Sequence, residues 1–169
     1  MSVNGSALFH SLLFACQRGL MESAGDEATR KLLPFVREYL ERSGISGLLD
    51  DTETDDPVDL LENLGEALAE SNLIQSYEAM RTEKGLDFAA KGCVFAKKVH
   101  ASLDPRDVTC PYGMLAIAMI ERRFGRCVNK AISTFTPSDS ETSIEFSPGT
   151  STALDRVPDT RKTDIGVET

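Results

Sequence analysis

The sequence predicts an α+β fold: an antiparallel sheet of about four strands packed against helices, with an N-terminal helical segment and a flexible C-terminal tail. Three observations predict it. Apolar residues recur at helical spacing in several stretches, strand-like runs occur in two pairs that are each joined by a short polar turn, and the residues after 147 have no apolar period. We expect a helical segment at 1–48, an acidic linker at 49–56, a binding domain at 57–147 and a disordered tail at 148–169.

Composition and charge narrow the class of protein. Of the 169 residues, 41% are hydrophobic and 27% charged, which is ordinary for a globular domain. The net charge is −9 and the Lys and Arg residues are scattered, which argues against a nucleic-acid partner or an anionic membrane surface. The apolar stretch Ala7–Cys16 is interrupted by His10 and follows no basic residue, so it predicts a folded helix rather than a signal peptide. We therefore expect a cytoplasmic protein with reduced thiols and no membrane span.

The first elements are two helices between residues 6 and 43, divided at Gly25-Asp26. The second helix begins near Glu27, and Pro34 within it is expected to remove one backbone donor and kink it, unless the helix starts later. Cys16 and Cys127 are expected to be buried structural cysteines. The acidic run at 49–56 favours a solvated linker over a calcium loop, because the run lacks the central glycine that such a loop needs.

The binding domain should open with a helix and a hairpin. Asp56-Pro57 is a strong helix start, and the helix should run to about Ser71. Its apolar face consists of Val58, Leu61, Leu64, Ala67 and Leu68. The strand-like segments 74–81 and 86–90 follow, separated by a turn at 82–85.

Two further helices and a second hairpin complete the domain. A short helix is expected from Cys93 to about Leu103. The next helix, from Tyr112 to Phe124-Gly125, is apolar nearly all round, which is typical of a central helix. The strand-like runs 127–135 and 142–146 then form the second hairpin.

No complete catalytic motif is present, so binding or sensing is a better prediction than catalysis. An enzyme that uses Cys110 as its nucleophile is the weakest alternative, because it needs a base and the chain has only two histidines.

Cys93, His100 and Cys110 are the candidate metal ligands, with zinc as the candidate metal. On one continuous helix His100 would lie about 10 Å from Cys93, which is too far for one ion, unless the helix begins after Cys93. Cys93 and Cys110 are each expected at a helix start, where free amides favour a thiolate. They could hold a metal, form a redox-sensitive disulfide, or be packed thiols, the commonest of the three.

The candidate ligand-binding residues are Phe95, Tyr112, Met114 and Ile117. Small residues alternate with large apolar ones along the central helix, and this pattern allows room for an apolar pocket. The plain alternative is that the same stripe is solid core.

A run of residues also carries a resemblance to a known family. The order Cys110-Pro111-Tyr112-Gly113, then Phe124-Gly125-Arg126, then Ser133-Thr134-Phe135 and a last strand at 141–146 resembles the 4-vinyl reductase domain family of small-molecule sensors, which is similar in fold to TRAPP subunits. The resemblance implies a hydrophobic ligand held between helices and sheet. It also implies zinc in some members, with Cys93 and Cys110 as the matching thiols. The chain departs from the pattern near 133–137 and at Thr142, where those sensors commonly carry further cysteines.

The sequence thus predicts a domain that binds or senses a small apolar molecule, with a cysteine-bound metal as an additional feature. The alternative is an interaction subunit that forms a homodimer through its N-terminal helices and its exposed Met and Leu side chains.

Overall fold

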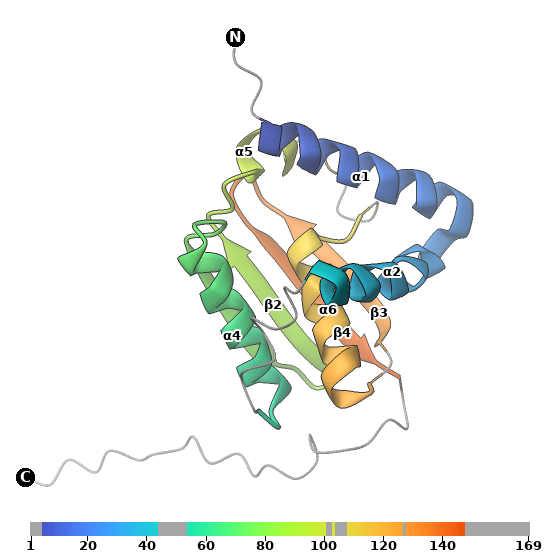
Figure 1. Cartoon of the computed structure of the whole chain (residues 1–169), viewed down its shortest axis with the longest axis vertical. Coiled ribbons are helices and arrows are strands. Elements are labelled where there is room, and N and C mark those ends of the chain that lie inside the picture. The colour runs from blue at the N-terminus through green and yellow to red at the C-terminus, as the bar shows by residue number, and fades with distance from the viewer. Residues whose placement is uncertain (1–4, 44–53, 101–102, 104–107, 127, 148–169) are drawn as a thin grey trace, which may run out of the picture.

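The structure of the chain is a computed structural model that describes residues 5–43, 54–100, 103, 108–126 and 128–147. It confirms the α+β class (Figure 1). The helical elements are α1 (Gly5–Ala24), η1 (Gly25–Glu27), α2 (Ala28–Ser43), α4 (Pro57–Glu70), α5 (Ala96–Val99) and α6 (Pro111–Phe124). The strands are β1 (Ser76–Arg81), β2 (Gly85–Lys91), β3 (Val128–Phe135) and β4 (Ser140–Phe146). The expected linker falls mostly, and the expected tail wholly, outside the described residues.

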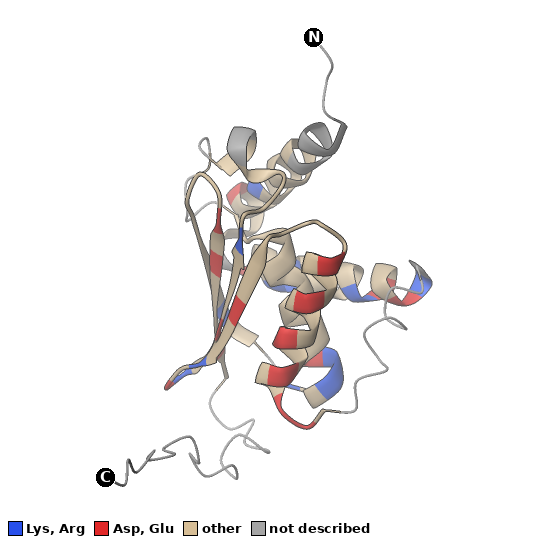
Figure 2. Ribbon diagram, turned by 90° about the vertical axis from the view of Figure 1, so that its left-hand side faces the viewer, with Lys and Arg blue, Asp and Glu red and all other residues tan. Residues whose placement is uncertain are grey.

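The four strands form one antiparallel sheet in the order β1-β2-β4-β3. Both expected hairpins are confirmed, and they meet where β2 pairs with β4, so β1 and β3 are the edges. Helices α4 and α6 pack on one face of this sheet (Figures 1 and 2). The face that they cover is apolar at its centre, where Leu86, Phe88 and Ile144 are each no more than 1% exposed. Burying this face stabilises the domain, since removing apolar surface from water contributes about 25 cal/mol per Å².

Helix α6 is central, as its composition predicts. Its buried side chains include Ile117 and Ile120, both 0% exposed. Gly113 allows the helix to approach β4 closely, because a Cβ at this position would lie 2.3 Å from the Thr142 Oγ1. The helix ends at Gly125, whose φ of 61° is a conformation that glycine adopts without strain.

The N-terminal helices divide at 25–27 as expected. Helix α2 packs on α6, and Leu33 belongs to the main core cluster. Pro34 is exposed inside α2, and the helix continues through it. The expected burial of Cys16 is wrong, because α1 turns Phe14 and Gln17 inward and leaves Cys16 exposed.

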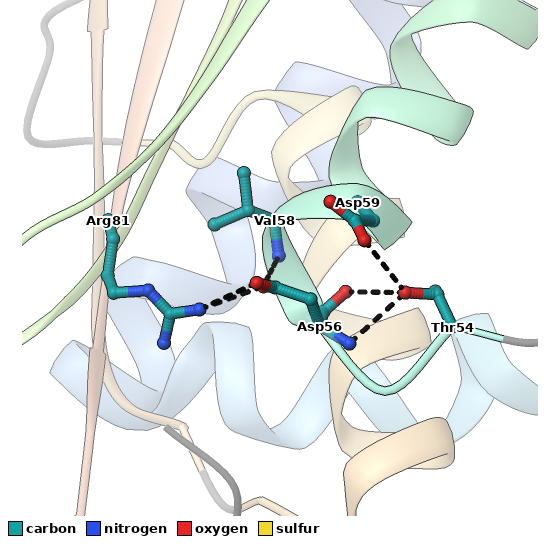
Figure 3. Close-up of polar contacts among 5 residues, drawn as sticks. All are labelled: Thr54, Asp56, Val58, Asp59 and Arg81. Carbon is teal, nitrogen blue, oxygen red and sulfur yellow. Dashed lines mark hydrogen bonds and ion pairs between the residues drawn. The ribbon is translucent and has the colours of Figure 1, made fainter. Parts of the chain in front are cut away.

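Asp56 fixes the start of α4, as the sequence predicts (Figure 3). Its carboxylate Oδ1 accepts a hydrogen bond of 2.8 Å from the Val58 N–H, which is otherwise free in the first helical turn. The Arg81 Nη2 donates to the same carboxylate at 2.9 and 3.0 Å. Since Arg81 ends β1, one side chain both caps the helix and ties it to the sheet.

The expected helix from Cys93 to Leu103 is wrong at its start. Helix α5 begins at Ala96, three residues later than expected, and is only four residues long. The backbone before it is held elsewhere: the Cys93 N–H donates to the Ser138 carbonyl at 2.9 Å, and the Val94 N–H donates to the Leu73 carbonyl at 3.1 Å. These bonds hold the segment to the turn between β3 and β4 and to the loop after α4, and the segment forms a turn there while the helix starts at Ala96.

Candidate functional site

The two sulfurs that the sequence singles out lie around Tyr112. Cys110 is the residue before α6 and is 2% exposed, and Cys93 lies in the turn before α5 and is 6% exposed. Both thiols lie near the Tyr112 hydroxyl, and burial, reinforced by these thiols, raises the pKa of Tyr112. The hydroxyl is buried and has no hydrogen bond of ordinary geometry within the described residues, although the Cys93 thiol is its neighbour.

Burial controls the chemistry of both thiols. It raises the pKa of Cys93 and of Cys110, and hydrogen bonds to the sulfurs offset this only in part. The expectation that helix starts would favour thiolates is therefore wrong. Cys93 does not begin a helix, and for Cys110 the loss of solvation outweighs the nearby amides of α6. Both groups stay protonated at neutral pH, which makes them poor nucleophiles.

His100 lies apart from this pair. Its Nδ1 is 3.2 Å from both the Thr136 and the Asp139 carbonyl oxygens, and its ring packs edge-on against Phe135 with centroids 5.0 Å apart. Burial lowers its pKa. Among the residues that the structure describes, no three His, Cys, Asp or Glu side chains lie close enough to hold a metal ion. His100 therefore does not join Cys93 and Cys110 in one site, and zinc binding stays a prediction.

The four candidate ligand-binding residues lie in two places, two of them in the core of α6 and two near the thiols or at the edge of the core. Met114 and Ile117 are core residues of α6, at 4% and 0% exposure. Tyr112 is buried beside the thiols, and Phe95 is half-buried at the edge of the core. Met114 also accepts a hydrogen bond from the Gln17 Nε2 at 3.2 Å, which joins α6 to α1.

The structure shows a cleft that the sequence did not predict. It has a volume of about 470 Å³ and lies between β3 and the helical hairpin α1–α2. The lining residues come from four segments: Met21; Thr29, Arg30 and Leu33; Val108 and Thr109; and Val128, Asn129, Lys130, Ala131, Ile132 and Ser133. Short segments so far apart in the chain share no motif or spacing, so no sequence pattern marks them as one site.

Hydrogen bonds fix the inner wall of the cleft. The Thr109 N–H donates to the Gln17 Oε1 at 2.9 Å, and its hydroxyl lies 2.9 Å from that of Thr29. Ser133 accepts a bond of 2.8 Å from the Cys110 N–H and shares another of 2.8 Å with the Thr142 hydroxyl. Bonds therefore connect this wall to α1, α2, β4 and Cys110, the residue before α6, so it is held in place before any ligand arrives.

The charge in the cleft is opposite to that of the chain. Of the described residues that line the cleft, the charged ones are Arg30 and Lys130, although the chain carries a net charge of −9. Arg30 contacts Glu27 at 2.6 Å at the surface. A guanidinium has five N–H donors, so this pair leaves others for a ligand.

Comparison of the chain with models of protein families, with curated proteins and with solved structures gave no match. The resemblance to the 4-vinyl reductase domain family therefore stays a prediction. None of the helices in the described part of the chain combines the length and the apolar character needed to cross a membrane.

Proposed function

We propose that this chain is a non-catalytic binding protein and that the cleft beside β3 is its binding site. The observation that carries the proposal is the cleft itself. Its volume of about 470 Å³ falls within the usual range for ligand sites. Its wall is already held by hydrogen bonds, so binding there costs little ordering of the protein.

The lining defines the chemistry of the ligand. Met21, Leu33 and Val108 offer apolar contact, while Arg30 and Lys130 offer positive charge. A ligand that combines an apolar part with an anionic group satisfies both. The protonated state of Cys93 and Cys110 supports a binding role over a catalytic one, because a thiol nucleophile must first lose its proton.

A matched pair of dyes tests the proposal. Anilinonaphthalene sulfonate has an apolar body and an anionic group, and phenylnaphthylamine has nearly the same body without the charge. We expect Arg30→Ala and Lys130→Ala each to weaken sulfonate binding about threefold, the effect of an exposed ion pair, and to leave the neutral dye unchanged. Arg42→Ala is the control, because Arg42 is an exposed cation of α2 that does not line the cleft. Equal losses for both dyes, or an equal loss in the control, would contradict the proposal.

A small and largely apolar molecule with one hydrogen-bonding group, bound beside Phe95 and Tyr112, is a second candidate. The buried Tyr112 hydroxyl favours it, since buried polar groups are nearly always hydrogen-bonded and this one has no such bond within the described residues. Native mass spectrometry and elemental analysis of protein purified under reducing conditions would report a carried ligand, zinc or a dimer in one experiment. Loss of a carried ligand in Tyr112→Phe would assign it to this site, and retention would exclude the site.

A further inference from the structure

The cleft exposes the edge of a β-strand. Six consecutive residues of β3, from Val128 to Ser133, line it. Side chains alternate between the two faces of a sheet, so a pocket over one face would contact every second residue. A pocket that contacts consecutive residues lies against the edge. β3 is an edge strand, since its only neighbour in the described sheet is β4.

The pairing of β3 with β4 identifies the backbone groups that point into the cleft. The Thr136 N–H donates to the Asp139 carbonyl at 3.0 Å and closes the hairpin. Hydrogen-bonded pairs alternate along an antiparallel ladder, so Ile132 exchanges its bonds with Ser143 of β4. Ala131, between two such pairs, directs its N–H and C=O away from β4.

Ala131 is the accessible point of this edge. Ser133 also points outward in the ladder, but it is only 1% exposed, because the segment around Cys110 covers it. Ala131 is half-buried and lines the cleft. A register shift between Val128 and Lys130 interrupts the regular ladder at the other end. The accessible stretch, residues 129–132, is about 10 Å long at the usual rise per residue, which suits a short extended segment.

Charge selects what can occupy the edge. A second copy that paired through its own β3 would bring the Arg30 and Lys130 of both copies to one place. Apart from Glu27, which pairs with Arg30 at the surface, no carboxylate among the described residues near the cleft balances them. A segment that carries carboxylates would instead be attracted. We propose that the cleft binds an extended acidic segment of a partner protein, which adds to the sheet as a fifth strand through the backbone of Ala131. This inference rests on the proposed function, because it names the ligand class of the same cleft.

Two alanines provide a matched test. Ala79 on β1 corresponds to Ala131, because it is also half-buried and lies on the opposite edge of the sheet. The Thr82 N–H donates to the Gly85 carbonyl, and hydrogen-bonded pairs alternate along the ladder from there, so the Ala79 N–H points away from β2. Proline at either position removes an outward donor and no bond to the neighbouring strand. The probe is a fluorescein-labelled octapeptide of alternating valine and glutamate, followed by fluorescence anisotropy. We expect Ala131→Pro to weaken binding about tenfold and Ala79→Pro to leave it unchanged.

A change in the peptide keeps the test independent of protein folding. Alternate residues of an added strand point their N–H groups toward β3, so N-methylation of one alternate set should abolish binding to the unaltered protein and methylation of the other set should not. Three results would each overturn strand addition. They are equal effects of methylation at the two sets of peptide residues, equal peptide affinity of Ala131→Pro and the unaltered protein, and no binding at about 1 mM peptide. If the sulfonate dye still binds the cleft while the peptide does not, only this inference fails. If neither binds, the proposed function fails as well.

Discussion

Replacing Asp56 with alanine tests how one side chain links α4 to the sheet. The change removes the acceptor of the Val58 N–H, and loss of such a cap typically costs about 1 kcal/mol of unfolding free energy. It also removes the ion pair with Arg81. The Arg81 and Asp56 side chains are 33% and 29% exposed, so this pair contributes about 0.2 to 1 kcal/mol. The expected total is about 1 to 2 kcal/mol. For a chain of this length, that corresponds to a fall in Tm of about 3 to 6 °C.

Urea unfolding followed by circular dichroism, in a double-mutant cycle with Arg81→Ala, separates the two contributions. Arg81→Ala should cost no more than about 1 kcal/mol, and Asp56→Ala should still cost about 1 kcal/mol in the Arg81→Ala background, because the cap does not need the arginine. Asp56→Asn is the control, since asparagine keeps the cap and removes the charge. If Asp56→Ala has no effect once Arg81 is absent, the carboxylate acts only through the ion pair and the account of the cap is wrong.

Three further outcomes follow from burial. Gly113→Ala should destabilise the protein by about 1 to 3 kcal/mol in urea unfolding, because the new Cβ would press into β4, whereas Gly19→Ala, where nothing lies within 4 Å, should be neutral or stabilising. Exposed Cys16 should react with iodoacetamide far faster than buried Cys110, whose pKa is raised; peptide mapping would show this, and equal rates would contradict it. Burial lowers the pKa of His100 below its ordinary value of 6.5. As pH falls through 6.5, the unfolded state therefore takes up the proton before the folded state, and the free energy of unfolding should decrease. His100→Asn should flatten this part of the curve of unfolding free energy against pH.

The sequence predicted the fold where local signals agree with the final packing. Asp56-Pro57 started a helix as expected, because a cap and an N-terminal proline need only their own segment. The all-round apolar pattern of 112–120 gave the central helix for a similar reason. The helix expected from Cys93 starts at Ala96 instead, and the segment before it forms a turn that is bonded to Ser138 and Leu73, which are distant in the sequence. Local propensity cannot register such bonds.

The candidate site was predicted only in part. Burial of Cys93 and Cys110 beside Tyr112 agrees with the preference of free cysteines for the core. Their pKa values moved in the direction opposite to the expectation, because that expectation considered helix amides and not desolvation. The cleft could not be predicted from the sequence, because it forms only where α1 and α2 pack beside the edge of β3.

The cations of the cleft show the limit of arguing from net charge. A total of −9 predicts repulsion of anions at long range, and Arg30 and Lys130 attract them only at contact. The two effects act over different distances, and salt separates them. At about 0.15 M ionic strength, charges more than about 8 Å away are largely screened, whereas groups in contact still interact. Low salt therefore works against an acidic ligand approaching this chain. A binding experiment done only at low ionic strength would underestimate the affinity of the cleft, so both the dye and the peptide need to be measured near physiological salt.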